Sequence, residues 1–197
     1  MRKLIYILIL SSASLVQAQE NFNIAQLDSI PTFNLESALE NPNEVKKITL
    51  KGKKTDVSKV NFSQFKNLQV LIIKRNNLET IPENITKCKT IKYLEISNNN
   101  IKNIPEKITD LENLMVLRLG QNKIDTIPEF IVKLKNLEIL DLWGNEMTTI
   151  PPELNEMIKL KLLDLRMIEF SQDKQNHIKD MLPWVQIKFS YSCNCGD

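Results

Sequence analysis

The stretch Leu68-x-x-Leu71-x-Ile73-x-x-Asn76-x-Leu78-x-x-Ile81-Pro82-x-x-Ile85-x-x-Cys88 decides the fold of this chain. The same pattern restarts 23 residues later at Ile91, and at that interval again at Leu114 and Leu137. Self-similarity at a fixed period of this length is typical of a solenoid, in which one unit cannot bury its apolar side alone and stacks on its neighbours. The sequence therefore predicts a stack of short repeats.

Each repeat contains a strand, a bend and a short return. Apolar residues at every second position, as in Leu71 and Ile73, predict a strand with these side chains turned inward. Successive strands then form one parallel sheet. Prolines such as Pro82 favour an extended or turn-like return rather than a full helix. An asparagine follows each strand, where its amide can serve backbone groups left unpaired by the bend; we expect this structural role for Asn76, Asn99, Asn122 and Asn145.

The pattern continues in weaker form at both ends, as expected for terminal repeats. Val45-x-x-Ile48-x-Leu50 lies one period before Leu68, and Leu160-x-x-Leu163-x-Leu165 lies one period after Leu137. Ser171 to Leu182 then resembles a polar helix ending at Pro183, and Trp184-x-x-Ile187-x-Phe189 predicts a last strand. We therefore expect seven strands, the last spaced by 24 residues rather than 23.

The unit Leu-x-x-Leu-x-Leu-x-x-Asn-x-Leu-x-x-Ile-Pro resembles the leucine-rich repeat family, and the resemblance extends from Val45 to about Phe189. It implies an α/β fold: a curved solenoid with a parallel sheet on the concave side and short extended or helical returns on the convex side. It also implies a non-catalytic binding module that contacts proteins, and sometimes other ligands, through the concave sheet. The family has no catalytic residues to transfer, so we expect no enzyme and no cofactor.

The N-terminus resembles a secretory signal. Arg2 and Lys3 precede an apolar run from Leu4 to Leu10, and small residues occupy the minus-three and minus-one positions of a predicted cleavage site after Ala18. An uncleaved anchor is the alternative, but the run is short for a bilayer core of about 30 Å. We expect a secreted or periplasmic protein with no membrane span after cleavage, and the following organisation: signal peptide 1–18, N-terminal cap 19–43, repeats 44–170, and a C-terminal cap helix, last strand and cysteine-containing tail 171–197.

The segment 19–43 contains one short helical candidate, around residues 34–39, which Asn41-Pro42 ends. We interpret it as a cap over the first repeat, because a solenoid otherwise leaves the apolar edge of its first unit exposed. A linker is the alternative.

Charge is distributed unevenly along the chain. Its net charge is +2, which becomes zero when residues 1–18 are removed, so a basic nucleic-acid binder is disfavoured. Residues 44–75 nevertheless hold nine basic and two acidic residues, whereas residues 76–157 hold nine basic and thirteen acidic ones. This polarity can steer an acidic partner to the first repeats, or it can serve only solubility.

Outward-pointing strand residues are the predicted contact surface. Trp143 beside Gly120 and Arg166 has the composition of a binding hot spot. A protein partner is our first prediction. A carbohydrate or envelope polymer stacking on Trp143 and Tyr93 is the alternative. The predicted binding residues are Ile72, Lys74, Tyr93, Glu95, Arg118, Asp141, Trp143, Asp164 and Arg166.

Two acidic residues provide a remote alternative, a hydrolase. Asp141 and Asp164 occupy the same slot of neighbouring strands, near the carboxylate spacing of retaining glycosidases. The predicted neighbours Arg118 and Arg166 favour ionised carboxylates instead, and we expect Glu95, Arg118 and Asp141 to form exposed cross-strand pairs.

The remaining reactive residues predict no metal site and no catalytic triad. His177, the only histidine, falls in the polar C-terminal helix, and Cys88 occupies an apolar core slot. Cys193 and Cys195 are too few for a closed zinc site. They can form a strained loop disulfide or an intermolecular bridge, or they can lie in an inert tail.

Overall fold

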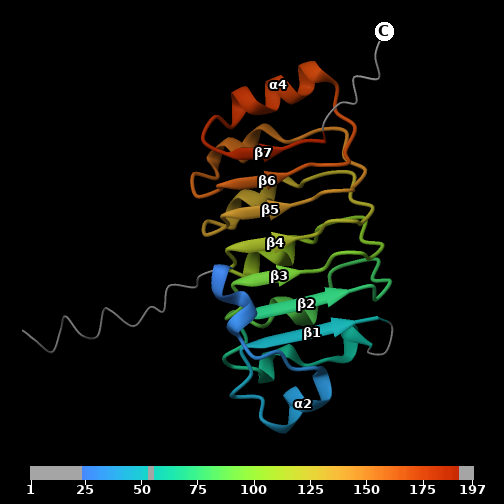
Figure 1. Ribbon diagram of the computed structural model, residues 1–197, viewed down its shortest axis with the longest axis vertical. Helices are drawn as coiled ribbons and strands as arrows, with labels where there is room; N and C mark the ends of the chain where they lie inside the picture. The colour runs from blue at the N-terminus through green and yellow to red at the C-terminus, as the bar shows by residue number, and fades with distance from the viewer. Residues whose placement is uncertain (1–23, 53–55, 191–197) are drawn as a thin grey trace, which may run out of the picture. The chain divides into compact units, whose positions relative to one another are not determined.

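A computed structural model of the protein describes residues 24–52 and 56–190 (Figure 1). The predicted signal peptide and the pair Cys193 and Cys195 lie outside these residues. The chain divides into two compact units, one ending at Ile30 and the other beginning at Pro31. In the first unit, Ile24–Ser29 form the 3-10 helix η1.

The second unit is built on one open parallel sheet, and this confirms the predicted repeat fold. Its strands follow one another in sequence order from β1 to β7, each paired with the next (Figure 1). The register matches residues one period apart, as in Leu71 beside Leu94 and Leu94 beside Leu117. The strands are β1 (Lys47–Lys51), β2 (Val70–Lys74), β3 (Tyr93–Glu95), β4 (Val116–Arg118), β5 (Ile139–Asp141), β6 (Leu162–Asp164) and β7 (Gln186–Lys188).

Short helices make the returns behind the sheet, in agreement with the narrow repeat. Each of the four central ones begins directly after its proline, whose extended backbone turns the chain away from the strand. The returns are η2 (Val57–Lys59), η3 (Phe62–Gln64), α3 (Glu83–Thr86), η4 (Glu106–Asp110), η5 (Glu129–Lys133) and η6 (Pro152–Glu156).

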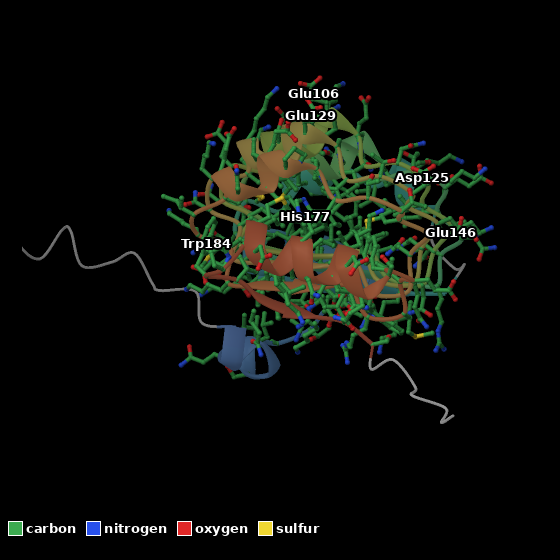
Figure 2. All side chains as sticks on the ribbon, turned by 90° about the horizontal axis from the view of Figure 1, so that it is seen from above. Glu106, Asp125, Glu129, Glu146, His177 and Trp184 are labelled. Atoms are coloured by element: carbon green, nitrogen blue, oxygen red, sulfur yellow. The ribbon has the colours of Figure 1, made fainter. Side chains whose placement is uncertain are left out.

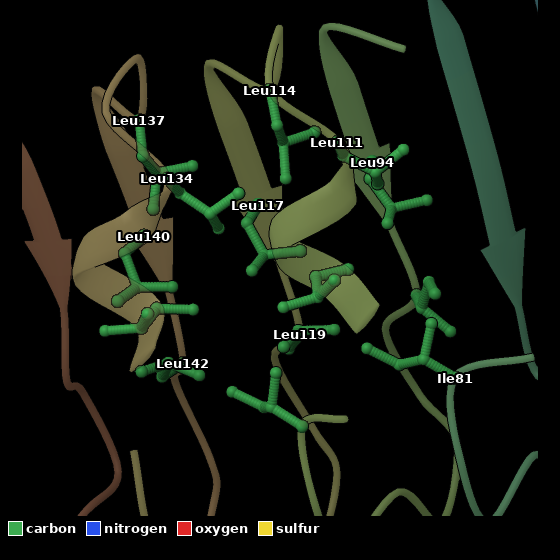
Figure 3. Close-up of a cluster of buried hydrophobic side chains, with 14 of the residues drawn as sticks. Ile81, Leu94, Leu111, Leu114, Leu117, Leu119, Leu134, Leu137, Leu140 and Leu142 are labelled. Atoms are coloured by element: carbon green, nitrogen blue, oxygen red, sulfur yellow. The ribbon is translucent and has the colours of Figure 1, made fainter. Parts of the chain in front are cut away.

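Equivalent side chains of successive repeats stack into continuous columns in the core (Figure 3). Leu94, Leu117 and Leu140 form one such column and are fully buried. Leu111 and Leu134, which follow the returns, face them from the other side and are also buried. Complete burial of a leucine contributes about 2 kcal/mol, so the columns supply most of the attraction between repeats.

The two ends of the sheet have different coverings. At the first end, α2 (Leu35–Glu40) begins at Asn34, whose side chain accepts the Ser37 N–H at 2.9 Å. Phe33 pairs with the free edge of β1: its N–H donates to the Lys47 carbonyl, and its carbonyl accepts from Thr49. At the other end, α4 (Gln172–Met181) lies beyond β7 (Figure 1).

The amides of the asparagine column bind backbone groups of neighbouring repeats. Asn122 donates from Nδ2 to the carbonyls of Ile96 and Leu119, both at 2.8 Å, and accepts the Ile101 N–H at 3.0 Å. Asn145 repeats this pattern one period later with Leu119, Leu142 and Ile124. Asn122 and Asn145 are both buried, and each of them thus joins two repeats through three hydrogen bonds to the backbone.

A column of left-handed backbone follows the strands, one residue per repeat. Two of its members are glycines, with φ of 76° at Gly52 and 65° at Gly144, but most carry side chains. Those with side chains are Arg75 (φ 57°), Asn98 (φ 56°), Gln121 (φ 54°) and Met167 (φ 57°). A side chain in this conformation costs roughly 1 kcal/mol relative to glycine.

Replacing Arg75 by glycine is therefore expected to stabilise the protein. Relief of the left-handed strain should raise the free energy of unfolding by up to about 1 kcal/mol, measured by urea denaturation. Lys102→Gly is the control, because exposed Lys102 has no positive φ. That variant should lose stability, and an Arg75→Gly protein that loses as much would contradict the strain argument.

Candidate binding site on the sheet face

The sheet face is the side of the sheet that carries the strand residues pointing away from the returns. Its residues form three rows that run from β1 to β7, and the register of the strands sets the order in each. The first row is Lys47, Val70, Tyr93, Val116, Ile139, Leu162 and Gln186. The middle row is Thr49, Ile72, Glu95, Arg118, Asp141, Asp164 and Lys188. The third row is Lys51, Lys74, Ser97, Gly120, Trp143, Arg166 and Ser190.

Glu95 is the centre of a buried polar cluster on this face. Its carboxylate accepts the Tyr93 hydroxyl at 3.0 Å and the Ser97 hydroxyl at 2.9 Å, and the Lys74 Nζ lies 2.7 Å away. The predicted exposed pairing of Glu95 with Arg118 is therefore wrong: Glu95 is buried. Three donors on neighbouring side chains replace the water around the Glu95 carboxylate, so this group can be buried against the sheet.

Tyr93 is buried as well, although the glycan alternative treats it as a stacking platform. Only 4% of the residue is exposed, and the Arg118 guanidinium carbon lies 5.6 Å from the ring centroid. Burial, and next the charge of Glu95, raise the pKa of the Tyr93 hydroxyl far above its usual range. Of the two aromatic residues predicted as platforms, only Trp143 is partly exposed.

Asp141 and Asp164 lie side by side in register but have different surroundings. Asp164 is buried and holds Arg166 with two parallel contacts, Nε to Oδ1 at 2.8 Å and Nη2 to Oδ2 at 2.7 Å. Asp141 accepts the Trp143 N–H at 3.3 Å, and the Arg118 Nε lies 3.9 Å from its Oδ2. Burial raises the pKa of Asp141, and the charge of Asp164 adds to the rise. The sequence suggested that the neighbouring arginines favour the ionised form of Asp141, but burial acts in the opposite direction and has the larger effect on its pKa.

The raised pKa of Asp141 predicts a dependence of stability on pH. The folded state binds the proton more tightly than the unfolded state, whose aspartate pKa is about 3.9. Protonated Asp141 therefore contributes its full share of the free energy of unfolding below the unfolded pKa of about 3.9. This contribution is lost as pH rises through the pKa of Asp141 in the folded protein. Asp141→Asn removes this loss, so the variant should gain stability relative to the parent as pH rises from about 3 to about 7. Urea midpoints across that range measure the difference, and equal slopes for the two proteins would contradict the assignment.

A groove of about 590 Å³ lies at the β5 to β7 end of the sheet face. Met167 is 65% exposed on its wall, and Arg166 is also exposed. The groove is lined by Trp143, Arg166, Met167, Phe189 and Ser190. It combines an indole, a phenyl ring, a thioether, a hydroxyl and a guanidinium, a set suited to an apolar side chain with a polar neighbour.

Gly120 makes room for the indole of Trp143. A Cβ atom on Gly120 would lie 2.2 Å from Trp143 Nε1 and 2.3 Å from Cδ1, which is closer than any two such atoms can approach. The indole of Trp143, two residues past the end of β5, therefore occupies the space that a side chain at position 120, two residues past the end of β4, would fill. The sequence placed Gly120 and Trp143 beside each other. The structure adds that the indole of Trp143 in this position requires a glycine at position 120.

Sequence reasoning missed Met167 as a member of the site. Its slot in the repeat is the left-handed one that Gly52 and Gly144 also occupy. That conformation leaves its side chain exposed at the end of β6 instead of burying it. Met167 falls at the same position of the repeat as Gly52 and Gly144, and this alignment could have indicated that its side chain is exposed beside the site.

Other reactive residues are placed as the sequence suggested. His177 is exposed on α4 (Figure 2), and Cys88 is buried, where burial raises the pKa of its thiol. Within residues 24–52 and 56–190, no three histidine, cysteine or acidic side chains gather closely enough to bind a metal ion. In the same described part of the chain, no helix has both the length and the apolarity needed to cross a membrane.

Comparison with known proteins identifies the fold further. Residues 44–185 match the family described as leucine-rich repeat region. A search of curated protein sequences gave no match. Among solved structures, a leucine-rich repeat protein of Leptospira interrogans is 27% identical, with a TM-score of 0.63, and the match covers 84% of this chain and 50% of that one.

Two further structures share the fold at lower identity. An internalin (inlF) of Listeria monocytogenes is 21% identical over 76% of this chain and 42% of its own, with a TM-score of 0.61. The ectodomain of the Arabidopsis thaliana receptor kinase GASSHO1/SCHENGEN3, solved in complex with CASPARIAN STRIP INTEGRITY FACTOR 2, is 23% identical over 82% and 20%, with a TM-score of 0.57. The chain thus spans no more than half the length of these three structures. The match over most of its length, together with the repeat geometry, shows that the chain belongs to the leucine-rich repeat family.

Proposed function

We propose that this chain is a non-catalytic binding module that contacts another protein through its sheet face. The observation that carries the proposal is the groove beside Trp143, where exposed apolar side chains lie next to a guanidinium and a hydroxyl group. A partly buried tryptophan next to an arginine is the composition of energetic centres in protein interfaces. The plant ectodomain with this fold, solved in complex with CASPARIAN STRIP INTEGRITY FACTOR 2, supports a protein partner.

The proposal includes export, which rests on the predicted signal peptide at residues 1–18. It also includes the assignment of the segment before β1 and of α4 as caps. Phe33 satisfies the free edge of β1, and Ile178 and Leu182 of the α4 region extend the core past the last strand. Both arrangements protect apolar or unpaired edges that a solenoid otherwise exposes.

A photo-crosslinking experiment tests the binding surface. The photoreactive amino acid p-benzoylphenylalanine replaces Met167 on the groove or, as a control, Ile158, which is 82% exposed after η6. The protein is then illuminated in envelope extract and in host-cell surface extract. We expect a partner that crosslinks from position 167, not from position 158, and that is lost when Trp143→Ala is added.

Two results would count against the proposal. Crosslinking of the same protein from both positions would move the contact away from the sheet face. Absence of a crosslinked protein, together with a Trp143-dependent signal on a glycan array, would favour the carbohydrate alternative. That alternative retains one observation in its support, the partly exposed indole beside polar groups.

A further inference from the structure

Acidic and basic side chains occupy different depths on the sheet face. The carboxylates lie low, with side chains 9% exposed at Glu95, 14% at Asp141 and 5% at Asp164. Their basic neighbours reach outward, with side chains 35% exposed at Lys74, 37% at Arg118 and 51% at Arg166. A molecule that approaches this face therefore meets ammonium and guanidinium groups first.

The long basic side chains also retain unused donors. Arg118 makes only a long contact to Asp141, with Nε 3.9 Å from Oδ2. That Nε is buried, so it is the terminal nitrogens of the guanidinium that can reach a partner. Asp164 engages Nε and Nη2 of Arg166, and a guanidinium has five N–H groups in all, so Arg166, which also lines the groove, has further donors beyond those two contacts. Lys51 and Lys188 extend the basic character to the first and last strands.

Apart from Glu95 and Asp141, the acidic residues that make the middle repeats net negative lie outside the three rows of the sheet face. Seen along the stack of strands, Glu106 and Glu129 are on the returns, and Asp125 and Glu146 are on the side where the strands end (Figure 2). Glu106 is moreover paired with Lys133 at 2.8 Å. The linear charge distribution, which pointed to the first repeats alone, therefore does not describe the sheet face, where basic groups protrude along its length.

From this charge arrangement, and resting on the proposed function, we propose that the partner presents an extended acidic peptide segment with an apolar side chain. The apolar side chain enters the groove beside Trp143, and carboxylates on either side of it meet Arg118 and Arg166. Arg118 is on β4, and Arg166 lies two residues past the end of β6. Their backbone positions are therefore two strand spacings apart across the sheet and two residues apart along it, or roughly 12 Å in all. An extended peptide advances about 3.3 Å per residue, so its carboxylates are spaced about three to four residues apart.

Selection from a phage-displayed library of random dodecapeptides on the immobilised mature chain tests this inference. We expect enriched peptides with acidic residues at a spacing of about three to four residues around an apolar residue. Affinities of the synthesised peptides are then measured by fluorescence anisotropy. The double variant Arg118→Gln, Arg166→Gln should weaken binding at least about tenfold, and added salt should weaken it further.

The matched control removes the same charge from the returns. Lys107→Gln, Lys133→Gln deletes two exposed lysines of η4 and η5 and should change affinity less than about twofold. Equal effects of the two double variants would overturn the inference. Enrichment of neutral or basic peptides that still depend on Trp143 would overturn the acidic partner but leave the proposed function intact.

Two further outcomes separate the classes of ligand. Enriched peptides that are all indifferent to Trp143→Ala would overturn both the acidic partner and the sheet-face site. Heparin fragments are measured alongside as an acidic polymer of another class. Binding of heparin that depends on Arg118, in the absence of any enriched acidic peptide, would assign the face to an anionic glycan and overturn the peptide proposal.

Discussion

Asn122→Ala is expected to lower the free energy of unfolding by about 3 kcal/mol, since it leaves the buried Ile96 carbonyl and Ile101 N–H without partners. The Leu119 carbonyl keeps its hydrogen bond from Asn145. The lost contacts are those to the carbonyls of Ile96 and Leu119 and to the N–H of Ile101. Leaving a buried donor or acceptor unsatisfied costs roughly 1 to 3 kcal/mol, and the cavity of the missing amide is too small to recover all of it with water. Urea denaturation followed by circular dichroism measures the change.

Asn113→Ala is the matched control for this loss. Asn113 also donates to a carbonyl of the preceding repeat, that of Lys89 at 2.9 Å, but its side chain is exposed. Water can replace that hydrogen bond, so we expect a change within about 0.5 kcal/mol. Similar losses for the two variants would show that burial of the amide is not what makes Asn122 important.

Gly120→Ala is expected to displace the indole of Trp143 and to lower the free energy of unfolding by roughly 1 to 3 kcal/mol, the usual cost of forcing extra volume into packed structure. The new methyl group would lie 2.2 Å from Nε1, so the ring must leave its position. In a Trp184→Phe background, which leaves Trp143 as the only tryptophan of the two in the chain, its emission should shift to longer wavelength.

A double-mutant cycle identifies the cause of that loss. In a Trp143→Ala protein the space above Gly120 is empty, so adding Gly120→Ala should cost less than about 0.5 kcal/mol. The coupling between the two sites then equals most of the single-variant loss. Additive effects would show that the alanine disturbs the strand itself rather than the indole.

The repeat period accounts for how much of the fold could be predicted. A residue and its equivalent one period later must lie beside each other in a parallel ladder, so the rows containing Glu95, Arg118 and Asp141 followed directly from the spacing. The extended prolines and the fully buried Ile85 and Ile108 followed from the same repetition.

The depth of side chains on the sheet face could not be predicted in this way. Glu95 is buried because Lys74, Tyr93 and Ser97 all donate toward it, and no neighbouring repeat has that combination. The repeat period determines which residues lie next to each other on the sheet. It does not determine which of two neighbouring side chains is buried and which extends outward over the other. Consequently the buried acids and protruding bases became visible only in the structure.

The left-handed column shows a similar limit. Gly52, Gly144 and Asn98 are residue types that favour positive φ, whereas Arg75, Gln121 and Met167 are not. Their conformation is imposed by the hydrogen-bonded repeat around them, as in the Gln121 N–H that donates to the Trp143 carbonyl at 2.7 Å. Local preference alone gave no indication of it.

Each strand of the sheet pairs only with the strands next to it in sequence. A chain that emerges N-terminus first, from the ribosome or from an export pore, can therefore add each repeat to a finished one without waiting for a distant segment. Once β4 has emerged, every partner of β1, β2 and β3 in the sheet is already present. The cell can in this way produce the protein with only the most recently made repeat exposing its apolar edge.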